Sequence, residues 1–265
     1  INVMDAIRLS SNTGVVKIID SVYNKKSKKF VDRLYNFGIA KPVISSIKGE
    51  PNPIIPHPND ESWNGLSMPW MTYGYGVKMT PIQILTFYNS IANDGEVVKP
   101  KFIHSTRKFG TNENKVYPKQ ILNKSIFSNY TNKVLKKMLY DVVHHQNGTA
   151  KNIKSKHLKL SGKTGTTQVD YITDTVNYIS SFVGYFPSDK PKYSCIIVLN
   201  KPNKSKGFYG NKVAAPVFKR IAEKIFSKYP KVEEYDLNEL NENIKFSKIE
   251  IKNSSSHKKI VSNGT

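Results

Sequence analysis

The sequence has little cysteine and no long apolar run. Cys195 is the only cysteine, so no disulfide can form within the chain, and its place in the run YSCIIVLN indicates a core residue rather than a nucleophile. No apolar stretch is long enough to cross a bilayer, and no signal peptide opens the sequence, which starts with Ile1. We therefore expect a fragment of a longer protein, whose membrane anchor lies outside this sequence.

Arginine and acidic residues are scarce beside lysine. The chain holds 41 Lys and Arg against 20 Asp and Glu, a formal net charge of +21. Arginine occurs only at Arg8, Arg33, Arg107 and Arg220. A nucleic-acid reader concentrates its charge and uses arginine for bidentate contacts, whereas these lysines are spread along the whole chain. We expect no nucleic-acid partner, and keep a non-catalytic basic interaction protein as one alternative.

Apolar residues are numerous enough for one main domain. Of 265 residues, 38% are hydrophobic and 11% aromatic, which is enough to bury a sizeable core. Beyond residue 229 the sequence becomes polar and repetitive. The composition predicts a domain over residues 1–229 and a polar linker or tail over 230–265.

The patterning predicts an α+β fold. Helices are expected on both sides of the SSN triplet and over residues 29–37, 81–94, 129–145 and 213–226. Residues 39–72 are rich in Pro, Gly, Asn and Ser and are expected to be mostly irregular. Three β-rich runs, LKLSGKTGTTQ, NYISSFVGYF and KYSCIIVLN, predict a three-stranded antiparallel sheet.

Two short motifs can carry chemistry, SSN at residues 10–12 and KTGT at 163–166. On a strand, Lys163 can place a cation in a cleft, attract a substrate carboxylate and hold nearby hydroxyls in a proton-transfer network. Thr164 and Thr166 offer hydroxyls for that carboxylate, and Gly165 leaves room for a substrate backbone along the strand edge. An isolated KTG is more simply a solvated strand with β-forming threonines and a bulge.

The surrounding sequence favours the chemical interpretation. Penicillin-binding serine enzymes combine S-x-x-K, S-x-N and K-T-G motifs in this order. The segments MPWMTYGYGVKMTPIQILTFYNSIANDGEVVKP, HQNGTAKN and FYGNKVAAPVFKRIAEKI resemble class B penicillin-binding proteins, most closely the division-specific FtsI type. The resemblance covers roughly residues 1–229. It implies a penicillin-binding/β-lactamase-like transpeptidase domain, an antiparallel sheet flanked by helices, truncated at its N-terminus.

This resemblance implies a peptidoglycan D,D-transpeptidase that acts in cell division. A serine would attack the carbonyl between the two terminal D-alanines of a stem peptide, release D-alanine and leave an acyl-enzyme, which an amine of a neighbouring strand resolves into a cross-link. β-Lactams imitate the D-alanyl-D-alanine end. The implied partners also include divisome membrane proteins such as a glycosyltransferase, and the implied location is the inner membrane, with a single-pass anchor and a periplasmic catalytic domain. A serine D,D-carboxypeptidase or β-lactamase remains an alternative.

The resemblance also assigns roles to residues. Ser10 would relay a proton to the leaving amine, Asn12 would bind the substrate amide and help orient the motif lysine, and the Thr166 N–H would be one oxyanion-hole donor. The resemblance thus implies that Ser10, Asn12 and Lys163 are catalytic. It implies that the substrate is bound by Thr164, Gly165 and Thr166. No metal and no cofactor is expected. The aromatic residues of the preceding loop, Trp63, Trp70, Tyr73 and Tyr75, are expected to pack against the domain and not to belong to the site.

The nucleophile is expected outside this sequence. In the family, S-x-x-K opens a helix before the S-x-N turn, but only nine residues precede Ser10 and none of them fits. The spacing occurs at Ser45, Ser105 and Ser255, all after the SSN triplet, and we interpret these as chance matches. The 265-residue chain alone is therefore predicted to be inactive, and to expose apolar sheet surface.

Overall fold

The computed structural model describes residues 1–43, 49–170 and 176–228. The chain forms one compact unit, Ile1–Lys224, and a second unit, Ile225–Thr265, of which only residues 225–228 are described. The predicted tail over 230–265 lies outside the described residues, so the predicted domain boundary stays a prediction.

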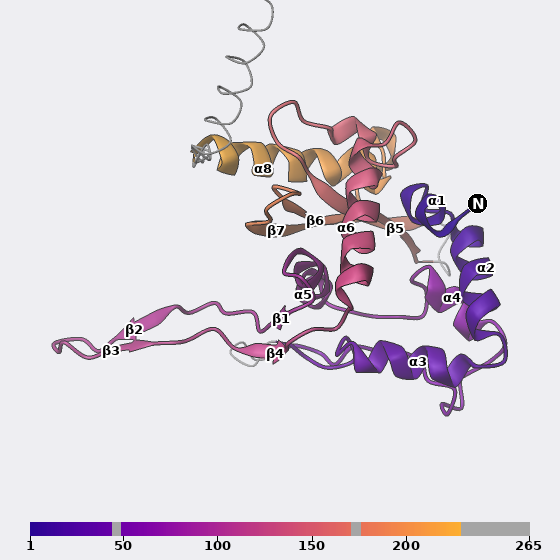
Figure 1. The fold of residues 1–265 in the computed structure, drawn as a ribbon, viewed down its shortest axis with the longest axis horizontal. Coiled ribbons are helices and arrows are strands. Elements are labelled where there is room, and N and C mark those ends of the chain that lie inside the picture. Colours follow the sequence, from indigo (N-terminus) through magenta and orange to yellow (C-terminus); the bar gives the residue numbers. More distant parts are fainter. Residues whose placement is uncertain (44–48, 171–175, 229–265) are drawn as a thin grey trace, which may run out of the picture. The chain divides into compact units, whose positions relative to one another are not determined.

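Helices are distributed along the whole of the described chain (Figure 1). In chain order the helices are α1 (Val3–Arg8), α2 (Asn12–Tyr23), α3 (Ser27–Asn36), α4 (Ser67–Thr72), α5 (Pro81–Ala92), α6 (Asn129–His144), α7 (Gly210–Val213) and α8 (Ala215–Lys228). Two 3-10 turns are added, η1 (Lys151–Ile153) and η2 (Lys204–Lys206). The start of α5 follows directly from its sequence: Thr80 and Gln83 form a reciprocal capping box, and Pro81 occupies the first turn, where no N–H is needed.

The predicted three-stranded sheet is confirmed. It consists of β5 (Ser161–Val169), β6 (Asn177–Phe186) and β7 (Tyr193–Asn200), antiparallel in the order β5-β6-β7. The strand β5 is therefore an edge strand, with one side of its backbone not paired within this sheet. In its register Lys163 lies opposite Val183, and Thr166 lies opposite Ser180.

Helices cover both faces of this sheet. On one face Tyr185 is buried with Ile91 of α5 and Leu139 of α6. Residues of opposite parity point to the other face, where Phe182 and Phe186 contact Phe218 of α8 at centroid distances of 4.8 and 5.7 Å. The alternating large side chains of β6 thus form the centre of the core, and the α+β prediction is correct.

One local prediction was wrong, that of a single helix over 213–226, and two stretches contain short elements that the sequence did not predict. Residues 39–72 contain the helix α4, which contributes Met71 to a separate apolar cluster with Tyr23 and Phe30. The single helix predicted over 213–226 is divided into α7 and α8, because Pro216 lacks the N–H that would continue the helical hydrogen bonds. The polar stretch after α5 forms two small sheets. They pair β1 (Val97–Val98) with β4 (Ile121–Asn123) and β2 (Ser105–Arg107) with β3 (Asn114–Val116).

Candidate active site

The SSN triplet forms the turn between α1 and α2, as predicted. Ser10 has φ of 52°, in the left-handed region that non-glycine residues rarely adopt. Ser11 is the N-cap of α2, since its hydroxyl accepts the Gly14 N–H at 3.1 Å. The cap fixes where α2 begins. It therefore also fixes the backbone of the turn, which sets the direction of the Ser10 side chain. Backbone strain at such a position is typical of functional turns.

Lys163 reaches this turn from β5. Its Nζ donates a hydrogen bond to Ser10 Oγ, across 153 residues of sequence, and a second one at 3.1 Å to the carbonyl of Thr164. Burial lowers the pKa of Lys163 to about 8. The two sequence motifs therefore meet in one place and share a hydrogen bond.

Close backbone contacts fix the position of β5. A Cβ on Gly162 would lie 2.5 Å from the Val183 carbonyl oxygen, and a Cβ on Gly165 would lie 2.4 Å from Ser181 Oγ. Glycine at 165 thus makes room for a hydroxyl of β6, a constraint different from the predicted approach of a substrate backbone. These contacts let β5 and β6 lie close together along the motif.

The two threonine hydroxyls have different neighbours. Thr164 Oγ1 lies 3.5 Å from Thr149 Oγ1, in the segment after α6. Thr166 is exposed, and its Oγ1 accepts the Gly210 N–H at 3.0 Å. A cation, two hydroxyls and an unpaired strand edge can together hold a peptide that ends in a carboxylate.

Comparison with known proteins identifies the family. Residues 1–223 match the family described as "Penicillin binding protein transpeptidase domain". The chain belongs to this transpeptidase family. Its α+β fold and its family membership, both predicted from the sequence, are confirmed by this match and by the solved structures that resemble it.

Its relatives among transpeptidases are longer proteins. The chain is 30% identical over 224 residues to the peptidoglycan D,D-transpeptidase FtsI of Buchnera aphidicola subsp. Baizongia pistaciae, which covers 83% of this chain and 36% of the relative. It is 25% identical over 219 residues to FtsI of Escherichia coli K12, covering 81% and 34%. The chain thus spans about a third of these relatives.

Solved structures of penicillin-binding proteins share its fold. Apo penicillin-binding protein 3 of Mycobacterium tuberculosis has a TM-score of 0.72 and 26% identity, covering 86% of this chain and 51% of that one. The same protein complexed with ampicillin has a TM-score of 0.72 and 25% identity, covering 88% and 53%.

The predicted site residues of this transpeptidase chain are only partly joined. Ser10, Lys163 and Thr164 form one hydrogen-bonded group. Asn12 is exposed in the first turn of α2, and its side chain makes no hydrogen bond to any described residue. Its predicted help in orienting the motif lysine stays a prediction.

Three residues near the motif strand were not assigned to the site from the sequence. The hydroxyl of Tyr75 accepts the Gln168 N–H at 3.2 Å, so this aromatic residue borders β5. The Thr149 N–H donates to the Arg8 carbonyl at 3.2 Å, and the third residue is Gly210. The segments GYG, NGTAKN and FYGNK already carried the family resemblance, and this was the available signal.

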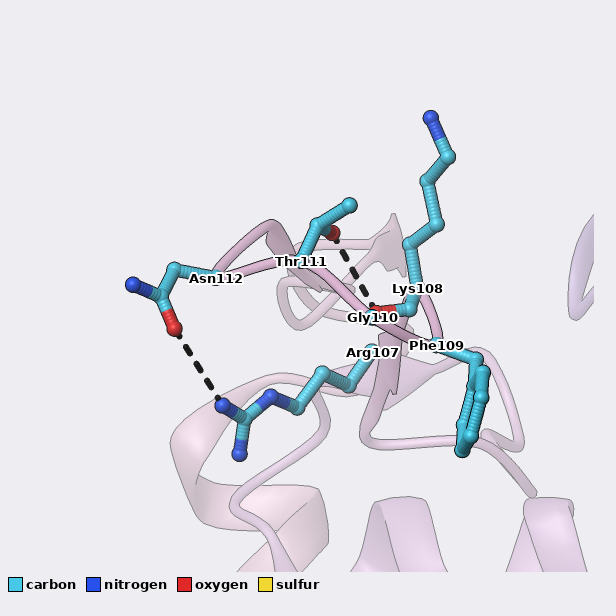
Figure 2. A pocket seen from close by; sticks show the side chains of 6 residues that line it. All are labelled: Arg107, Lys108, Phe109, Gly110, Thr111 and Asn112. Carbon is cyan, nitrogen blue, oxygen red and sulfur yellow. Dashed lines mark hydrogen bonds between the residues drawn. The ribbon is translucent and has the colours of Figure 1, made fainter.

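A hollow elsewhere on the chain lacks catalytic groups. It measures about 550 Å³ at the β2–β3 turn and is lined by Arg107, Lys108, Phe109, Gly110, Thr111 and Asn112 (Figure 2). All six come from one exposed turn, and the hydrogen bonds within it join Arg107 to Asn112 and Thr111 to the Lys108 carbonyl. Such a turn offers no pairing of a nucleophile with a base.

The sequence holds a fourth S-x-x-K match, Ser256 to Lys259, which lies outside the described residues. None of the four provides an alternative nucleophile in the described chain. Ser105 is exposed in β2 and pairs with Val116, in the same small sheet as the hollow. The matches at Ser45 and Ser255 lie outside the described residues.

Among residues 1–43, 49–170 and 176–228, no group of three or more His, Cys, Asp or Glu could hold a metal ion. Within the same ranges, no helix is long and apolar enough to cross a membrane.

Proposed function

We propose that this chain forms one wall of the active site of a serine-type peptidoglycan D,D-transpeptidase that also binds β-lactams. The observation that carries the proposal is the hydrogen bond from Lys163 Nζ to Ser10 Oγ, beside an edge strand that presents two threonine hydroxyls. The names of the relatives, FtsI among them, support the same activity. Cross-linking requires a carboxylate-ended donor peptide, and this strand offers groups that bind one.

The proposed nucleophile is a serine of an S-x-x-K motif outside this sequence. In the proposed reaction its oxygen attacks the penultimate D-alanine carbonyl, and the bond to the terminal D-alanine breaks. Ser10 hands a proton to the departing amine, and Lys163 holds the Ser10 hydroxyl in place for that transfer. The Thr166 N–H stabilises the oxyanion, and the amine of a second stem peptide then takes the acyl group.

The parent protein, meaning this chain together with the segment that supplies the nucleophile, allows the activity to be tested. We expect the acyl group of a stem-peptide thioester analogue to be transferred to an added D-amino acid or stem-peptide amine faster than to water. Transfer to water alone would instead identify a D,D-carboxypeptidase. Rapid turnover of penicillin would identify a β-lactamase. If no acyl transfer occurs but duplex DNA is bound with a steep salt dependence, the chain is a basic interaction protein.

Acylation should depend on pH through Lys163. Because burial lowers its pKa to about 8, the ammonium is present below that pH and is lost as the pH rises through it. We expect the second-order rate constant for acylation of the parent protein by penicillin to fall above about pH 8. The methyl ester of the same penicillin, which lacks the carboxylate, should not show this fall. If the acid and the ester gave parallel pH profiles, this would contradict an attraction between the Lys163 ammonium and the penicillin carboxylate.

We propose that the parent protein acts at the division site, anchored by a single helix in the inner membrane with this domain on the periplasmic side, among divisome proteins such as a glycosyltransferase. The FtsI name of the relatives supports the division role. Depletion of the parent protein should produce filamentous cells. Loss of rod shape with continued septation would place it in lateral growth instead.

A further inference from the structure

The segment that runs from Phe208 into α7 lies against β5. The Gly210 N–H donates to Thr166 Oγ1 at 3.0 Å. A hydroxyl that accepts a hydrogen bond on one side must direct its own proton elsewhere. Because Thr166 is exposed, its proton is available to an acceptor outside the chain.

The approach of Gly210 to the sheet is too close for a side chain. A Cβ there would lie 2.5 Å from the carbonyl oxygens of both Gly165 and Ser181. Such contacts cannot be relieved by turning a flexible side chain, because both oxygens belong to backbone. The position of the N–H relative to Thr166 is thus set by backbone packing, and depends on what holds the segment in place.

Asn211 holds one end of this segment. Its Nδ2 donates to the Thr149 backbone carbonyl at 3.0 Å, and its backbone carbonyl accepts a hydrogen bond from Asn152 Nδ2 at 2.7 Å. These two bonds tie α7 to the loop after α6. The same loop contacts the end of α1, just before the SSN turn, since the Thr149 N–H donates to the Arg8 carbonyl at 3.2 Å.

The sheet holds the other end. The Ser180 hydroxyl donates to the Phe208 carbonyl. The ring of Phe208 stacks on Tyr178 at a centroid distance of 4.0 Å and an angle of 17°. Both partners belong to β6, the neighbour of β5, so this end is fixed to the sheet, while Asn211 joins the other end to the loop after α6.

We propose that Asn211 is a positioning residue, which fixes the Gly210 N–H on Thr166 and so aims the Thr166 hydroxyl proton at a substrate carboxylate. This inference rests on the proposed function. Asn211 acts through Gly210, since its own side-chain N–H is bonded to the Thr149 carbonyl. Its effect reaches the ligand only through the Thr166 hydroxyl, so it is specific for ligands that carry the carboxylate.

The test compares penicillin with its methyl ester on the parent protein. In Asn211→Asp the side chain can no longer donate to the Thr149 carbonyl and would repel it. We expect the rate constant for acylation by the acid to fall about tenfold, the size of one charge-assisted hydrogen bond, with the ester rate unchanged. Asn203→Asp is the control, because it adds the same charge at the N-cap of η2. Capping there needs only an acceptor for the Ser205 N–H, which aspartate also provides, so neither rate should change.

A double-mutant cycle assigns the effect to Thr166. If Asn211 acts through this hydroxyl, Asn211→Asp should cause no further loss in a Thr166→Val background. Equal losses for acid and ester, or an undiminished effect without the hydroxyl, would overturn the role of Asn211 and leave the proposed function intact. A wild-type parent protein that neither compound acylates would overturn the proposed function itself, and this inference with it.

Discussion

Replacing Lys163 by Met in the parent protein should lower the rate constant for acylation by penicillin about 10³-fold, within the range for loss of a positioned proton-transfer group. Methionine keeps the unbranched, apolar part of the side chain but removes the ammonium. Ser10 then loses the donor that holds its hydroxyl, and the carboxylate of the ligand loses its counter-charge. Stopped-flow or quench kinetics with a fluorescent penicillin would measure the effect.

A lysine on the same sheet serves as the control. Lys190 is exposed in the turn between β6 and β7, so Lys190→Met removes a charge from the same sheet without touching the Ser10 turn. Its acylation rate should match that of the wild-type protein. If Lys163→Met were acylated at the wild-type rate, the Lys163–Ser10 contact would be structural only.

A methyl group on Gly184 should destabilise the domain by about 3 kcal/mol, the upper end for overpacking a core. A Cβ there would lie 2.1 Å from the Ser161 carbonyl oxygen and 2.9 Å from the Gly162 Cα, so β5 and β6 would have to separate. Because β5 carries Lys163, acylation should weaken along with stability. Urea or thermal denaturation of Gly184→Ala in the parent protein measures the loss.

Gly65→Ala is the matched control for this substitution. It adds the same methyl group, but a Cβ at Gly65 meets no atom within 4 Å. Its unfolding midpoint should stay close to that of the wild-type protein. Equal midpoints for the two variants would show that β5 and β6 do not pack as closely as described.

Local sequence patterns predicted the centre of the fold well. The runs that became β6 and β7 are long, rich in β-branched and aromatic residues, and separated by a Pro and Asp turn, so their pairing could be read directly. The capping signal of Thr80 and Pro81 likewise marked the start of α5. In each of these cases the signal lies within a few neighbouring residues.

Shorter elements could not be read in this way. The strands β2 and β3 have three residues each and are exposed throughout, so they lack the alternation of buried and exposed positions that identifies a strand. The helix α4 has six residues and lies within a segment rich in turn-forming residues. Both were missed because periodicity requires length.

The site depended on contacts that span the chain. Each motif could be found in the sequence, but the meeting of Ser10 with Lys163 came from the family resemblance and not from spacing. Nothing local indicated that Gly210 would touch Thr166, or that Asn211 would bind the Thr149 carbonyl. The lowered pKa of Lys163 also arises from burial, which is a property of the folded chain.

The central claim is that this chain supplies one wall of a penicillin-accepting site, and that the acylated serine lies outside it. Labelled penicillin, followed by intact-mass analysis and peptide mapping, tests this on the parent protein and on the 265-residue chain in parallel. We predict a covalent adduct on the parent protein alone, at a serine before Ile1. A stable adduct on the 265-residue chain, at any of its serines, would contradict the account.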